Sequence, residues 1–168
     1  VEKTNKQEKI IHDTLNQVVK KIQLKVPSEL KDTAKTFVKL YYANVPLEDL
    51  MELSPEALAQ SVYEMWTFSF QRLQEQTKIR AYSTKRKINN STVSQTIVEV
   101  VNDNMPFLVD SVIGAINSLG YSIHLVIHPV MKVGRDNTHT LKTIFHHTAE
   151  TEENARINFN ESLFFSTS

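Results

Sequence analysis

The chain has 168 residues, which is enough for one domain with a hydrophobic core or for two small domains that share an interface. Its 19 Lys and Arg balance 19 Asp and Glu, so no net attraction to nucleic acid or to an anionic membrane surface is expected. The sequence contains no cysteine, which excludes disulfides, thiolate metal sites and cysteine nucleophiles. Because no window approaches the roughly 18 apolar residues of a membrane span and the polar start lacks a signal core, we expect a cytoplasmic protein.

Two amphipathic helices are predicted first. Over residues 6–25 the apolar residues recur at spacings of three and four, and Pro27 follows the end of this pattern. Ser28 is the expected N-cap of the second helix, which Pro46 closes. The apolar residues of the second helix are Leu30, Ala34, Phe37, Val38, Tyr41 and Tyr42.

A third helix is predicted after a short turn at residues 47–50. Ser54 supplies a cap, Pro55 suits the first helical turn, and Glu56 complements the helix dipole. A wide apolar band follows, which we interpret as core and not as a cofactor site because aromatic residues dominate packing energetics. Its members are Leu58, Val62, Met65, Trp66, Phe68, Ser69 and Leu73.

The pattern changes after Gln76, where strand-forming residues become frequent. We expect a short strand near residues 79–82, a solvated loop that carries the basic run at 85–87, and a second strand over 93–101. Pro106 predicts the start of a helix that ends at Gly120. A strand over 121–133, a turn at 134–137 and an antiparallel strand over 140–147 complete the predicted unit.

Alternate residues of the 121–133 strand belong to two chemical classes. One face is apolar throughout and is expected to pack on the preceding helix; it consists of Tyr121, Ile123, Leu125, Ile127, Pro129, Met131 and Val133. The other is only half apolar; it consists of Ser122, His124, Val126, His128, Val130 and Lys132. A strand, helix and strand in this order usually form a right-handed crossover with parallel strands. The predicted fold class is therefore α+β, with a helical segment at 1–76 and a sheet domain at 77–168.

Two segments, Val98–Val112 and His124–Val130, resemble the amino-terminal region of the large bacterial-type NAD-specific glutamate dehydrogenases. Residues 54–58 and 66–72 resemble the same region more loosely. In that family this region precedes the catalytic part and is similar to ACT domains, which bind amino acids or pair sheets between subunits. The resemblance therefore implies an ACT-like, ferredoxin-like unit. Family members continue after residues matching 161–165, so we expect the fold here to lack its last strand and helix.

The resemblance also implies a function. Members of the family oxidatively deaminate L-glutamate to 2-oxoglutarate and ammonium with NAD, and their catalytic and NAD-binding residues lie beyond the stretch that this chain resembles. We therefore expect no catalytic residue and no cofactor in this chain, and a regulatory or assembly role beside the remainder of the dehydrogenase chain in a homo-oligomer. The alternative is a free-standing ACT-like sensor that binds an amino acid.

One candidate effector site is the loop that leads into the helix predicted to start near Pro106. Free backbone N–H groups at a helix N-terminus can receive a carboxylate, and ACT-like domains place amino-acid effectors at this kind of turn. The other interpretation is that the Asn and Asp residues only form and cap the turn. The residues concerned are Asn102, Asp103, Asn104, Met105, Pro106 and Phe107.

The half-apolar strand face is the candidate interface, through His124, Val126, His128 and Val130, because histidine and valine together suit a partly wet contact. It is expected to pack either on the helical segment or on another subunit. His124 and His128 lie roughly 13 Å apart along a strand, too far for one metal ion. His146 and His147 point to opposite faces of a strand, so no metal site is expected.

Overall fold

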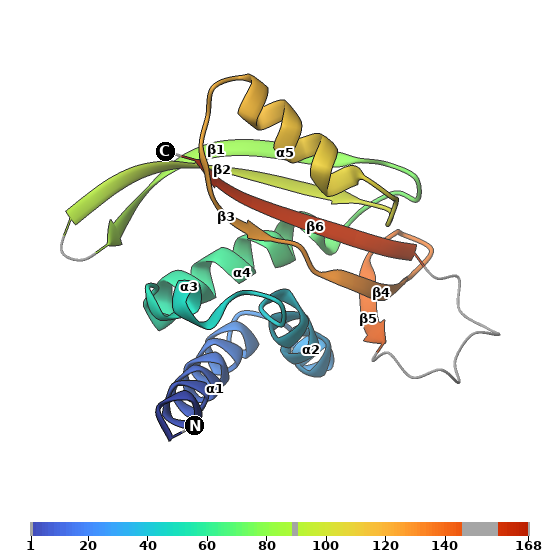
Figure 1. Cartoon of the computed structure of the whole chain (residues 1–168). Coiled ribbons are helices and arrows are strands. Elements are labelled where there is room, and N and C mark those ends of the chain that lie inside the picture. Colours follow the sequence, from blue (N-terminus) through green and yellow to red (C-terminus); the bar gives the residue numbers. More distant parts are fainter. Residues whose placement is uncertain (1, 89–90, 146–157, 168) are drawn as a thin grey trace.

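The computed structural model describes residues 2–88, 91–145 and 158–167, with side chains for 7–85, 92 and 94–145. The first half is helical: α1 (Glu2–Gln23), a 3-10 turn (Ser28–Leu30), α2 (Lys31–Tyr41), α3 (Leu47–Met51) and α4 (Pro55–Phe70). The second half contains β1 (Lys78–Ile88), β2 (Ser91–Asn102), α5 (Leu108–Ser118), β3 (Ile123–Ile127), β4 (Val130–Arg135), β5 (Leu141–Phe145) and β6 (Asn158–Thr167). The α+β prediction is confirmed. Figure 1 shows α1–α4 on one face of the sheet and α5 on the other.

The sheet has the order β1-β2-β6-β4-β5, and β3 also pairs with β6. Every neighbouring pair is antiparallel, including β4 with β5, as the sequence predicted for the returning strand. Because β2 and β3 both run antiparallel to β6, they are parallel to each other, in agreement with the predicted crossover. They are not neighbours, however, because β6 lies between them.

The position of β6 corrects one expectation. The fold was expected to lack its last strand, which family members continue after the segment near 161–165. Instead, this segment lies within β6, which pairs with β2 from Asn102↔Glu161 to Thr96↔Thr167 and also with β3 and β4. It joins the β1–β2 hairpin to the β4–β5 hairpin, so the last strand is central to the sheet.

One continuous hydrophobic core joins the helical segment to the sheet. Trp66 meets the Phe37 ring edge-on at 5.3 Å between centroids, and the buried Tyr42 hydroxyl donates to the Leu58 carbonyl at 2.7 Å. The aromatic band of α4 is therefore core, as predicted. The core includes Val18, Ile22, Phe37, Tyr41, Leu58 and Trp66 from the helices, and Ile97, Val101, Ile127, Met131 and Leu141 from the sheet. The proposed division at residue 76 stays a prediction.

Several local expectations need correction. Ser28 lies in the 3-10 turn and makes no cap for α2, whose N-cap is Leu30. Residues 47–50 are the start of α3 and not a simple turn. Leu73 follows the end of α4 and is exposed. The basic run at 85–87 belongs to β1, which pairs with β2 as far as Ile88↔Ser91, so it is strand and not loop.

The predicted single strand over 121–133 is two strands. It is interrupted between Ile127 and Val130, because Pro129 has no N–H group to donate to a sheet. Leu125, Ile127, Met131 and Val133 pack with the α1–α4 core, whereas Ile123 and Val126 pack with α5. The apolar face of residues 121–133 was expected to pack on the preceding helix, α5. This expectation was wrong for most of the length of that face. None of the described helices has the length and apolarity needed to cross a membrane.

Candidate functional site

The β2–α5 loop, residues 102–107, is anchored at its start and exposed at its end. The Asn102 side chain is buried and accepts a hydrogen bond from the Thr77 hydroxyl at 2.8 Å. Asp103 forms an ion pair at 2.8 Å with Arg72, which is only 2% exposed and also donates from Nε to the Gln76 carbonyl. The first two loop residues therefore fix the loop to the segment that connects α4 to β1.

The second half of the loop opens at the N-terminus of α5. Phe107 has a φ of 63°, a left-handed conformation that costs energy for a bulky residue, and its side chain is 77% exposed. It provides no side-chain cap, so the first N–H groups of α5 have no capping side chain. A pocket of about 370 Å³, here called the α5 pocket, lies at this point; its lining is Asn104, Met105, Pro106, Phe107, Leu108, Val109, Asp110 and His128.

The structure brings only part of the candidate interface to this pocket. His128 is half-buried and lines the α5 pocket, and Val126 packs in the cluster beneath α5. His124 is exposed at a register shift between Ile123 and Leu125, and Val130 is exposed on β4. No three His, Cys, Asp or Glu of the described residues gather as a metal site would require; His146 and His147 lie outside those residues.

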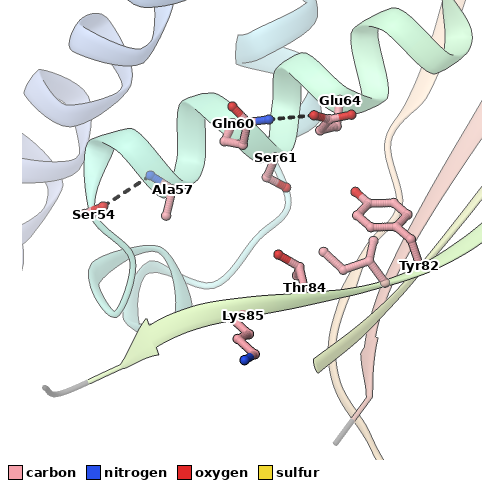
Figure 2. A pocket seen from close by; sticks show the side chains of 9 residues that line it. Ser54, Ala57, Gln60, Ser61, Glu64, Tyr82, Thr84 and Lys85 are labelled. Carbon is pink, nitrogen blue, oxygen red and sulfur yellow. Dashed lines mark hydrogen bonds between the residues drawn. The ribbon is translucent and has the colours of Figure 1, made fainter. Parts of the chain in front are cut away.

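A second pocket, the α4–β1 pocket, lies on the helical side of the sheet and has a volume of about 290 Å³. Its lining residues come from α4 and from the two first strands: Ser54, Ala57, Gln60, Ser61, Glu64, Tyr82, Thr84, Lys85 and Ile97. In Figure 2, Tyr82 and Thr84 point from β1 towards α4, whereas the amino group of Lys85 points away from the helix. The wall therefore combines hydroxyl, amide and carboxylate groups with an apolar surface of similar extent.

A buried charge network lies behind this wall. Glu99 is fully buried on β2, and Arg80 Nε donates to its carboxylate. Burial raises the pKa of Glu99 in spite of the opposing effect of Arg80. The pKa of Tyr82 is raised by burial and then by the charge of Glu99, to which its hydroxyl donates at 3.4 Å. Tyr82 therefore remains a neutral hydrogen-bonding group across the physiological range.

Two further cations hold the C-terminus of α4 against the sheet. Lys78 Nζ donates to the carbonyls of Phe68 at 2.6 Å and Gln71 at 2.8 Å. Arg135 donates from Nη1 to the Phe70 carbonyl at 2.8 Å and from Nη2 to the Ser69 carbonyl at 2.7 Å. Cations at this position stabilise the negative end of a helix dipole. Burial, and then the nearby charge of Arg72, lowers the pKa of Arg135 to about 10.

Sequence reasoning missed the α4–β1 pocket, although a signal was present. Glu99 interrupts an apolar run on β2, and a carboxylate in such a run requires a buried partner. Arg80 and Tyr82 are two residues apart on β1, so their side chains lie on the same face of the sheet, the face that α4 covers. Ser61 and Glu64 are three residues apart on α4 and hence neighbours on its surface.

The chain is similar to known proteins over most of its length. The family model for the ACT1 domain of glutamate dehydrogenase matches residues 37–166. The chain is 32% identical over 138 residues, 82% of its own length, to an NAD-specific glutamate dehydrogenase of Halomonas elongata, and 29% identical over 108 residues, 64% of its length, to that of Pseudomonas aeruginosa. It spans only 9% and 7% of these relatives.

No solved structure is significantly similar to the chain. The family match begins within α2 and continues through α3, α4 and the sheet, so it includes helices that share the core with the strands. It covers well over half of the chain. On this match, the chain belongs to the family of ACT1 domains of glutamate dehydrogenase.

Proposed function

We propose that this chain is a non-catalytic regulatory and assembly region of a cytoplasmic, homo-oligomeric NAD-dependent glutamate dehydrogenase. The parent enzyme oxidatively deaminates L-glutamate to 2-oxoglutarate and ammonium, and the remainder of its chain binds NAD. The proposal rests on family membership and on one observation: the loop before α5 leaves large apolar side chains open to solvent. Met105 is 50% exposed and Phe107 is 77% exposed. None of the side chains of α5 is fully buried.

An apolar rim of this kind is typical of a protein contact surface. Phe107 is held in a conformation that favours glycine, and the residue nevertheless carries a large ring into solvent. Covering that ring would bury apolar area and offset the conformational cost. We therefore assign the contact to Met105, Phe107 and the half-buried His128, which line the same pocket.

Sedimentation velocity over a wide concentration range tests the assembly role. We expect wild-type chain to self-associate, and Phe107→Glu or His128→Glu to weaken this association at least about tenfold. Leu24→Glu is the matched control, because Leu24 is also highly exposed but follows α1, which lies on the other face of the sheet from α5 (Figure 1). Identical sedimentation of wild type and Phe107→Glu at every concentration would contradict an assembly role for this surface.

Measuring NADH formation tests the non-catalytic assignment. With saturating L-glutamate and NAD, the chain alone is expected to give the same rate as a heat-inactivated sample. Sustained turnover above that rate would overturn the assignment.

The second candidate function is a free-standing amino-acid sensor, and the uncapped N-terminus of α5 favours it. The first-turn N–H groups of α5 can receive a carboxylate, while Asp110 lines the same pocket and can accept from an ammonium group. Calorimetry with a panel of L-amino acids separates the two candidates. Saturable binding that Asp110→Asn weakens would favour sensing, whereas no heat of binding would favour assembly.

A further inference from the structure

Arg72 is buried at a point where four segments of the chain meet. The residue is 2% exposed and follows the C-terminal end of α4. Its Nε donates to the Gln76 carbonyl at 2.6 Å, its Nη1 to Asp103 Oδ1 at 2.8 Å, and its main-chain N–H to the His139 carbonyl at 3.2 Å. Arg72 therefore joins the end of α4 to the α4–β1 connection, the β2–α5 loop and the β4–β5 turn.

The contact with Asp103 reaches the loop that carries the proposed contact surface. A second contact of the same loop lies beside it. The buried Asn102 side chain accepts from the Thr77 hydroxyl at 2.8 Å and donates from Nδ2 to Met105 Sδ at 3.2 Å. Both anchors come from the segment that follows α4, and α4 and α5 lie on opposite faces of the sheet (Figure 1). The loop before α5 is therefore held by the part of the chain that packs on the other face.

The left-handed conformation of Phe107 requires support from both sides. A φ of 63° is unfavourable for a bulky residue, and it persists only where the neighbouring structure imposes it. On the C-terminal side, the Phe107 carbonyl accepts from the Ser111 N–H at 2.9 Å, in the first turn of α5. On the N-terminal side, only residues 104–106 separate Phe107 from Asp103 and its buried partner. The Arg72–Asp103 ion pair therefore supports the conformation that carries the Phe107 ring into solvent.

The proposed contact surface consists of Met105, Phe107 and His128 and is called the α5 contact surface below. We propose that Arg72 is a positioning residue for this surface: through Asp103 it holds the β2–α5 loop in the conformation that exposes Phe107 to a partner. The effect on a partner rests on the proposed function, whereas the effect on the loop does not. One face of the sheet thereby depends on the helices of the other.

The conformation of Phe107 is measured by NMR on the isotope-labelled chain. A positive φ brings the amide and α hydrogens of one residue close together, so Phe107 should give a strong intraresidue NOE. Asp103→Asn keeps the size of the side chain and removes its charge. It should weaken this NOE and speed the exchange of the Ser111 amide at least about fivefold. Asp103→Glu restores the charge and should keep the exchange rate within about threefold of wild type, with the NOE retained.

A control separates positioning from a general loss of stability. Glu56→Gln also removes an ion pair, with Lys21 at 3.0 Å, but at the other end of α4. It should leave the Phe107 NOE and the Ser111 exchange rate unchanged. A loss of global stability alone does not alter an NOE of the folded state, whereas a loss of positioning weakens it.

Sedimentation velocity connects the loop to assembly. Asp103→Asn should weaken self-association at least about threefold, although Asp103 is not a member of the α5 contact surface. If wild type does not self-associate, or if Phe107→Glu leaves its association unchanged, the proposed function fails while the NOE still decides the positioning of the loop. A weakened NOE with unchanged association, in a chain whose association Phe107→Glu does weaken, would overturn the effect on the partner.

An unchanged Phe107 NOE in Asp103→Asn would overturn the positioning role, whatever the chain does in sedimentation. Should Asp103→Asn fail to fold, Arg72→Lys takes its place. Lysine keeps the charge but has no planar group that serves the Gln76 carbonyl and Asp103 together. Arg72→Lys should weaken the NOE in the same way, and an unchanged NOE in this variant would equally overturn the role of Arg72.

Discussion

Replacing Arg135 by Met should loosen the contact between α4 and the sheet. The guanidinium donates three hydrogen bonds to main-chain carbonyls, to Phe70 at 2.8 Å, to His139 at 3.1 Å and to Ser69 at 2.7 Å. Each contributes about 1 kcal/mol net, and a cation at a helix C-terminus adds about 0.5 kcal/mol. Met would keep much of the packing volume and lose all of these bonds.

Burial of the charge reduces this loss. The pKa of Arg135 is lowered to about 10, mainly by burial and secondly by the charge of Arg72. The folded state therefore disfavours the charged form of Arg135. The Arg135 Nε also finds no hydrogen-bond partner among the described residues. We therefore expect Arg135→Met to lower the free energy of unfolding by about 2–3 kcal/mol, less than the sum of its bonds.

Urea unfolding measures this change through far-UV circular dichroism and the fluorescence of Trp66, the single tryptophan, which is buried on α4. Lys142→Met is the control, since Lys142 forms an exposed ion pair with Asp136 at 3.2 Å on the same hairpin. Its loss should cost less than about 1 kcal/mol. If Arg135→Met proves no more destabilising than Lys142→Met, the guanidinium does not hold the helix end as described.

Three other predictions follow from named contacts. Glu99→Gln should remove a pH dependence of the stability. Burial raises the pKa of Glu99 above its usual 4.5, so the folded state binds this proton more tightly than the unfolded state does. The resulting stabilisation is present below pH 4.5 and is lost as the pH rises through the pKa of Glu99 in the folded state. The difference in unfolding free energy between wild type and Glu99→Gln should thus fall as the pH is raised from about 4.5, and a constant difference would refute this. Gly120→Ala should cost about 1 kcal/mol in urea unfolding, because Gly120 has a φ of 83°; an unchanged midpoint would mean that the helix end relaxes freely. A double-mutant cycle of Arg72→Met and Asp103→Asn should give a coupling energy of about 1–2 kcal/mol, whereas strict additivity would show that their 2.8 Å contact contributes nothing.

The helical half could be predicted well because its signals are local. The spacing of apolar residues located α1, α2 and α4, and the Ser54 cap of α4 is present, with Ser54 Oγ accepting from the Ala57 N–H at 3.2 Å. Gly120 indeed ends α5 with a positive φ. The interruption at Pro129 was missed because the alternation of polar and apolar residues continues through it, although a proline already argues against a central strand.

The sheet order could not be predicted, since it depends on contacts between residues far apart in the sequence. Nothing local in residues 158–167 indicates that they lie between β2 and β4. The two halves of the α5 pocket illustrate the same limit: the loop at 102–107 was recognised as a candidate site, but its meeting with His128 depends on the path of β3. The ion pair of Arg72 with Asp103 also could not be predicted from a local pattern, because the two residues are 31 positions apart in the sequence.

The central position of β6 has a consequence for how the chain acquires its fold. The β1–β2 and β4–β5 hairpins form from neighbouring segments, but in the described structure they are joined through a strand that leaves the ribosome after both of them. Until that strand emerges, each hairpin presents an unpaired backbone edge of the kind that attracts other extended chains. The nascent protein is therefore vulnerable to misassembly until residues 158–167 have been synthesised and β6 is inserted between the two hairpins.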